Sequence, residues 1–160
     1  MNSERKQLFI THLFDAPVEA VFQAWIDPDQ LIHWYAPDGC AIEFRTIDVS
    51  TGGRFHSCIH DPVHGECWVK GTYLEVTPNR RLVFTMIMSD EAGNSVSSVA
   101  AGKSQDWPEH QTTTVTFQAL GAQTKVSIYQ TVSEEEARKT GAYQGWLKML
   151  GRLSSMLVEI

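Results

Sequence analysis

The sequence predicts an α+β domain in which a curved antiparallel sheet wraps around one long C-terminal helix. Between residues 134 and 160, apolar residues recur every three or four positions, the spacing of a helix that buries one face. Residues 40–132 instead alternate with a period of two and are interrupted by turn residues, which is typical of successive strands. The connections between these strands are too short for crossover helices, so we expect antiparallel pairing.

The N-terminal part of the sequence predicts a strand and two short helices. Residues 7–14 have the aromatic and β-branched content of a strand. Pro17 then suits the first turn of a helix, which we expect to continue to about Asp27. A second short helix is expected over residues 30–34.

Six further strands account for the middle of the chain. They are expected near residues 41–48, 53–60, 66–77, 81–89, 111–119 and 124–132, which with the first strand makes about seven. The stretch 89–110 is small, polar and unperiodic, and unstructured connections of this length in a compact domain are often functional. We therefore expect residues 89–110 to form a mobile flap.

The last predicted element is a helix over residues 134–160. Ser133 and the three glutamates after it favour a helix start, because a hydroxyl can cap free amides and carboxylates suit the positive end of the dipole. Gly145 and Gly151 interrupt the helix, each at a cost of about 1 kcal/mol relative to alanine, and we expect them to make room for a ligand. The expected apolar stripe consists of Tyr143, Trp146, Leu147, Leu150, Leu153 and Leu157.

Composition restricts the classes of function. The 160 residues suit a single domain, 1–160, that can fold without a structural cofactor or metal. The 13 basic and 19 acidic residues give a net charge of -6, which argues against nucleic acid or an anionic membrane as a partner. Apolar runs long enough for a signal peptide or a spanning helix are absent from the sequence, and the odd number of cysteines, three, suggests free thiols. We therefore expect a cytoplasmic protein.

The order and spacing of several short segments resemble one known family. They are Phe14-Asp15-Ala16-Pro17, Trp34, Asp48 with Gly52-Gly53, residues 71–75, residues 81–85, residues 112–117 and Gly145-Trp146. In these segments the chain resembles the activator of Hsp90 ATPase homologue 1-like (AHSA1-like) branch of the START/Bet v 1 superfamily, also called SRPBCC or polyketide cyclase-like. The resemblance implies a helix-grip fold, with a cavity between the sheet and the terminal helix. It does not name a reaction, because this fold hosts carriers, receptors, cyclases and cochaperones.

Two histidines and a cysteine alternate along one predicted strand. His56, Cys58 and His60 share one face of it, but residues four apart on a strand are about 13 Å apart, too far to bind one ion together. A turn at residues 61–65 would place His60 opposite Glu66 and Cys58 opposite Trp68, and a Cys58, His60 and Glu66 site would lack a fourth ligand. We therefore expect no metal and no cofactor, and assign His56 and Cys58 to a cavity wall, with the outer face of the sheet as the alternative.

Aromatic residues and methionines indicate a pocket for a small molecule. The expected cavity residues are Trp34, Tyr35, His56, Cys58, Met86, Met88, Trp107, Tyr143 and Trp146. The leading hypothesis is binding of a small, mainly apolar ligand. A cyclase- or hydrolase-like enzyme that uses His56, His60 or Tyr143 is one alternative, and an Hsp90-type interaction module is another. The sequence names no catalytic residues and leaves homodimerisation open.

Overall fold

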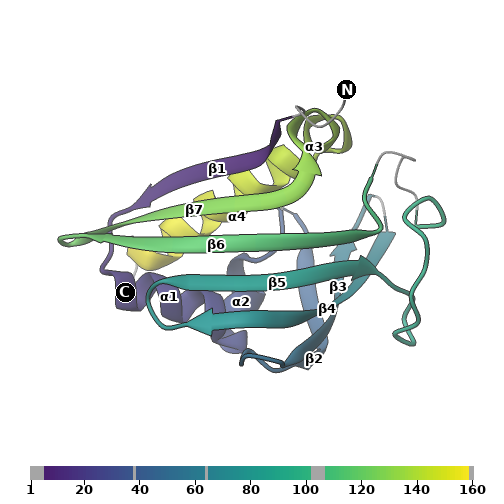
Figure 1. Cartoon of the computed structure of the whole chain (residues 1–160), viewed down its shortest axis with the longest axis horizontal. Helices are drawn as coiled ribbons and strands as arrows, with labels where there is room; N and C mark the ends of the chain where they lie inside the picture. Colours follow the sequence, from purple (N-terminus) through teal and green to yellow (C-terminus); the bar gives the residue numbers. More distant parts are fainter. Residues whose placement is uncertain (1–5, 38, 64, 102–106, 159–160) are drawn as a thin grey trace.

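The computed structural model describes residues 6–37, 39–63, 65–101 and 107–158. Within these ranges, the chain forms an antiparallel sheet and four helices (Figure 1). The strands are β1 (Gln7–Phe14), β2 (Ala41–Ile47), β3 (Arg54–Asp61), β4 (Gly65–Thr77), β5 (Arg81–Met88), β6 (His110–Leu120) and β7 (Gln123–Ser133). The helices are α1 (Val18–Ile26), α2 (Pro28–Trp34), α3 (Glu134–Thr140) and α4 (Ala142–Val158).

The seven strands form one curved sheet in the order β1-β7-β6-β5-β4-β3-β2. Every neighbouring pair is antiparallel, and the first strand of the chain lies beside the last. Helix α4 runs across one side of this sheet, with α1 and α2 on the same side (Figure 1). The predicted helix-grip architecture is therefore confirmed.

Helices α1 and α2 form a buried corner beside α4. The Asp27 carboxylate accepts a hydrogen bond from the Asp29 amide at 3.0 Å and caps α2, whose first residue is a proline. At the other end of α2, the Trp34 indole donates to the carbonyl of Ala24 in α1 at 3.0 Å and packs edge-on against Trp25. These contacts fix the two short helices to each other.

The C-terminal helical region is two helices, so the prediction of one helix from residue 134 is wrong. Ser133 caps α3 as expected, accepting from the Glu136 amide at 3.0 Å. Gly141 then adopts φ +86°, a left-handed conformation that ends α3. The helical period continues through this glycine in the sequence, and for that reason the break was not predicted. Residues 159 and 160 lie outside the described residues.

The buried face of α4 also differs in part from the predicted stripe. Trp146, Leu150, Leu153 and Leu157 are buried, but Leu147 is 45% exposed. Met149, which was not predicted, is buried. The buried face of α4 therefore includes Met149 and excludes Leu147, so the prediction for Leu147 is wrong.

Candidate functional site

A cavity of about 670 Å³ lies between the sheet and the helices. Trp25 of α1, Leu31 of α2 and Trp146 of α4 line the helical side. Strands β2 to β7 provide the other wall with their inward-facing side chains. The volume falls within the range of about 300–1,000 Å³ typical of small-molecule sites.

Aromatic side chains form two groups around this cavity. The rings of Trp25 and Trp146 stack with centroids 6.1 Å apart, and Tyr35 meets Trp146 edge-on at 5.8 Å. On the sheet, Phe55 and Phe84 both lie against Tyr73 at 5.6 Å. Most of the wall is therefore apolar and held in place by ring contacts.

Two glutamines place amides in this apolar wall. Gln111 of β6 is only 2% exposed, and neither its amide nitrogen nor its amide oxygen has a hydrogen-bond partner among the described residues. Gln130 of β7 is also buried, but its amide nitrogen donates to the Thr113 hydroxyl at 3.0 Å. Gln111 therefore presents an unused donor and an unused acceptor to the cavity.

The tyrosines in the wall are neutral groups. Burial raises the pKa of the Tyr35 phenol, and Tyr73 raises it further. Burial likewise raises the pKa of Tyr73. Both phenols remain protonated at neutral pH, so they can donate hydrogen bonds but cannot serve as bases.

Cys40 and Asp61 meet at one edge of the cavity. Burial raises the pKa of the Cys40 thiol, and the charge of Asp61 raises it further. A thiol with a raised pKa is a poor nucleophile, because the thiolate is the reactive form. The arrangement gives no support to cysteine chemistry.

Five of the predicted cavity residues line the cavity: Tyr35, Met86, Met88, Trp107 and Trp146. Trp34 does not line it, because its side chain is completely buried against α1. Tyr143 also lies outside the lining, half-buried beneath the guanidinium of Arg138, whose carbon is 4.0 Å from the ring centre. These two assignments to the cavity were wrong.

The assignment of His56 and Cys58 to the cavity wall is also wrong. Phe55 and Ser57 of β3 line the cavity, so the residues that alternate with them face the outer side of the sheet. The alternation in the sequence shows which residues share a face, but a strand with Phe55 on one face and His56 and Cys58 on the other does not reveal which face is covered.

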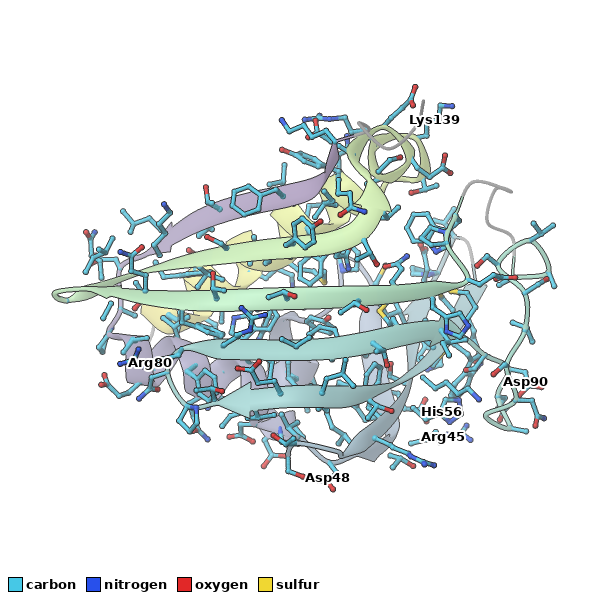
Figure 2. All side chains as sticks on the ribbon, in the orientation of Figure 1. Arg45, Asp48, His56, Arg80, Asp90 and Lys139 are labelled. Atoms are coloured by element: carbon cyan, nitrogen blue, oxygen red, sulfur yellow. The ribbon has the colours of Figure 1, made fainter. Side chains whose placement is uncertain are left out.

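On that outer face, the segment after β5 lies against β3 and β4. A ring nitrogen of His56 lies 3.1 Å from the Asp90 carbonyl, and the Lys70 ammonium donates to the Gly93 carbonyl at 2.9 Å. Arg45 pairs with Glu91 at 3.1 Å, and Figure 2 shows Arg45, His56 and Asp90 near one another. Part of the predicted flap is thus attached to the outer face.

The two glycines of α4 have different surroundings. Gly145 lines the cavity, and a Cβ added there would meet the Pro37 ring at 3.7 Å. Gly151 is exposed, and a Cβ added there would meet nothing within 4 Å. Gly145 therefore leaves space beside the cavity as expected, whereas the expectation for Gly151 is wrong.

Solved structures from several bacteria have the same fold. A protein from Arthrobacter aurescens is 22% identical, with a TM-score of 0.81 over 98% of this chain and 88% of that one. A protein from Mycobacterium smegmatis is also 22% identical, with a TM-score of 0.79 over 96% and 91%. The AHSA1 protein from Silicibacter pomeroyi is 17% identical, with a TM-score of 0.75 over 95% and 97%. At these identities the likeness shows the fold alone.

The family is shown by the sequence itself. No curated protein matches the chain significantly. Among the described residues, no helix is both long and apolar enough to cross a membrane. The family model described as activator of Hsp90 ATPase homolog 1-like protein matches residues 15–158, nearly the whole chain. The chain belongs to the activator of Hsp90 ATPase homolog 1-like family.

Proposed function

We propose that this protein binds a small, mainly apolar molecule that carries a polar group, in the cavity between the sheet and α4. The observation that carries the proposal is Gln111, a buried amide without a hydrogen-bond partner among the described residues, in a wall that is otherwise mostly apolar. A buried polar group without a partner costs about 1–3 kcal/mol. A ligand hydroxyl or carbonyl that pairs with this amide would remove that cost.

The character of the wall narrows the ligand class. Stacked rings and methionines suit flat or flexible apolar molecules, and the neutral phenols of Tyr35 and Tyr73 add hydrogen-bond donors. Flavonoids, aromatic polyketides and fatty acids combine apolar bulk with such polar groups. These three classes form the screening panel.

The first experiment uses two glycines of the same helix. The leucine side chain in Gly145→Leu would start 3.7 Å from Pro37 and occupy cavity space, whereas in Gly151→Leu it would extend into open space. We expect panel members that raise the melting temperature of the parent to raise that of Gly151→Leu equally and to lose the effect in Gly145→Leu. A panel without any such compound, or equal shifts in both variants, would count against a ligand in this cavity.

A second variant tests the role of Gln111. In Gln111→Leu, the side chain keeps its bulk and loses both polar atoms. Ligands with a hydroxyl or carbonyl should bind about 2- to 10-fold more weakly, because one hydrogen bond contributes roughly 0.5–1.5 kcal/mol and each 1.4 kcal/mol corresponds to tenfold. Purely apolar analogues should bind with unchanged affinity. Equal loss for both kinds of ligand would contradict the proposed pairing.

The enzyme alternative loses the residues on which it rested. His56 and His60 lie on the outer face of β3, and Tyr143 lies outside the cavity lining. Within the wall, the phenols of Tyr35 and Tyr73 are neutral and the Cys40 thiol has a raised pKa, so these three groups do not supply a base. The Hsp90-type interaction module is favoured by the family description alone, so it stays a prediction, as does homodimerisation.

A further inference from the structure

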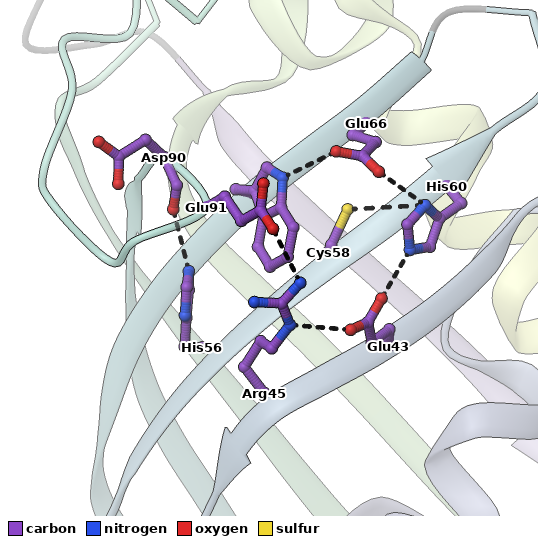
Figure 3. Close-up of polar contacts among 9 residues, drawn as sticks. Glu43, Arg45, His56, Cys58, His60, Glu66, Asp90 and Glu91 are labelled. Atoms are coloured by element: carbon purple, nitrogen blue, oxygen red, sulfur yellow. Dashed lines mark hydrogen bonds and ion pairs between the residues drawn. The ribbon is translucent and has the colours of Figure 1, made fainter.

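The outer face of the β3–β4 hairpin carries three side chains with different metal-binding atoms: Cys58, His60 and Glu66, here called the hairpin cluster. A thiol sulfur, an imidazole nitrogen and a carboxylate oxygen of these residues all lie within 4.8 Å of one another. Figure 3 shows them converging from neighbouring strands. We propose that the hairpin cluster binds a divalent transition-metal ion of the Zn²⁺ type.

The distances fit one shared ion. His60 Nδ1 lies 3.4 Å from Glu66 Oε2 and 4.0 Å from Cys58 Sγ. With Zn–N, Zn–O and Zn–S bonds of about 2.0–2.3 Å, tetrahedral ligand atoms stand about 3.3–3.6 Å apart. Small side-chain rotations would therefore bring the three atoms into a coordination shell. The strand register supports this, since His60 pairs with Glu66 and Cys58 pairs with Trp68.

Neighbouring groups already orient two of the three ligands. One oxygen of the Glu43 carboxylate, Oε1, lies 2.9 Å from His60 Nε2. The other oxygen, Oε2, lies 2.9 Å from Nε of the Arg45 guanidinium. At this distance the Glu43 carboxylate can accept a hydrogen bond from His60 Nε2. That bond leaves Nδ1 as the ring nitrogen directed toward Cys58 and Glu66. A carboxylate that holds the far nitrogen of a histidine is a common outer shell of zinc sites.

Glu66 is oriented in a similar way. The Trp68 indole donates to Glu66 Oε1 at 3.2 Å, which leaves Oε2 directed toward His60. His60 and Glu66 side chains are 40% and 53% exposed, whereas Cys58 is fully buried. An ion can thus enter from solvent and reach the thiol beneath it.

Three protein ligands are sufficient for such a site. Cys58, His60 and Glu66 lack a fourth protein ligand, for which reason the sequence predicted no metal here, but zinc sites with three protein ligands and one water are common outside purely structural roles. A thiolate with an imidazole favours Zn²⁺, Co²⁺, Ni²⁺ or Cu²⁺ over Mg²⁺ and Ca²⁺. On binding, the Cys58 S–H bond breaks, its electron pair forms the sulfur–metal bond, and the proton leaves to solvent.

Cobalt titration of the reduced, chelator-treated full chain tests the site. We expect one equivalent of Co²⁺ to produce a thiolate-to-cobalt charge-transfer band in the near ultraviolet, and added Zn²⁺ to abolish it. Cys58→Ser should remove the band. Cys67→Ser is the matched control, because Cys67 is a free cysteine on the adjacent strand whose side chain faces the cavity, and it should retain the band.

Two further variants separate coordination from folding. Glu66→Gln alters a half-exposed side chain and should weaken Co²⁺ binding at least tenfold while the melting temperature without metal stays close to that of the parent. Glu43→Gln tests a positioning residue, and it should weaken affinity about 10- to 100-fold while the charge-transfer band keeps its position. Absence of a stoichiometric band, a band that survives in Cys58→Ser, or equal loss in Cys67→Ser would overturn the proposal.

Discussion

Two buried glutamines line the same cavity, and the same substitution is expected to affect the stability of the protein in opposite directions. In Gln111→Leu, two polar atoms that lack partners among the described residues disappear, so we expect the free energy of unfolding to rise by about 1–3 kcal/mol without ligand. In Gln130→Leu, the bond to the buried Thr113 hydroxyl is lost, and stability should fall by about 1–3 kcal/mol. Urea denaturation of both variants measures this, and equal destabilisation would show that Gln111 is already satisfied.

His12 is expected to make stability depend on pH. Its ring lies 3.0 Å from the Ser154 hydroxyl of α4, and burial lowers the pKa of His12 below its usual value of about 6.5. The unfolded chain therefore binds a proton at a pH where the folded protein does not. This contribution is fully present above about pH 6.5 and is lost as the pH falls toward the lowered pKa.

The measurement compares urea midpoints at about pH 7.5 and pH 5.5. In His12→Gln the decrease between these two values should be smaller than in the parent. Ser154→Ala is the control, since it removes the hydrogen bond and keeps the buried imidazole, so the parental decrease should remain. An unchanged decrease in His12→Gln would assign the effect to other groups.

At the scale of elements, the strands were predicted well because each carries its own signal. Period-two alternation and flanking turn residues placed six strands, and aromatic and β-branched content placed β1, all within a few residues of their observed bounds. The register of β3 with β4 also followed from the sequence, because the turn at residues 61–65 fixes which residues pair. Local pattern was sufficient for these features.

The site was harder to predict because it depends on which face of each strand meets α4. Cys58 is fully buried although it lies on the outer face of the sheet, opposite Trp68 in the register of β3 with β4. The segment after β5 also lies against this outer face, through His56. A buried residue of β3 can therefore lie on either face of the sheet. Gln111 was missed, although it occupies the same alternating face of β6 as Val115 and Phe117. A polar residue in register with core residues was the available signal.

Two glycines in the C-terminal region should respond oppositely to alanine. Gly141 has φ +86°, which disfavours any side chain, so Gly141→Ala should lower the free energy of unfolding by about 1–2 kcal/mol. Gly151 lies inside α4 with open space around its Cα, so Gly151→Ala should raise it by up to about 1 kcal/mol. Thermal and urea unfolding of both variants check this, and a stabilising Gly141→Ala would contradict a break between α3 and α4.

At the scale of the whole molecule, α4 connects parts that are far apart in the sequence. It lies across the sheet, and the Arg152 guanidinium donates to the carbonyls of Ala36 and Pro37 in the connection between α2 and β2. The same helix supplies Trp146 and Met149 to the cavity wall. The hydrophobic core and the cavity wall therefore share α4. Substitutions at its buried residues should lower the stability of the whole domain.

Leucines of α4 should differ widely in how much their substitution by alanine lowers the free energy of unfolding. Leu150 and Leu153 are completely buried, whereas Leu147 is 45% exposed. A buried Leu→Ala substitution costs about 2–5 kcal/mol, so the double variant Leu150→Ala/Leu153→Ala should lose at least about 4 kcal/mol, much of the 5–15 kcal/mol typical of a domain.

Leu147→Ala, the matched control, should change the free energy of unfolding by less than about 1 kcal/mol, because its side chain is already largely hydrated. Urea unfolding followed by near-ultraviolet circular dichroism distinguishes the two cases, since the tryptophans around the cavity report on the packing of α4. If Leu147→Ala proves as costly as the double variant, α4 packs through the broader stripe that the sequence predicted.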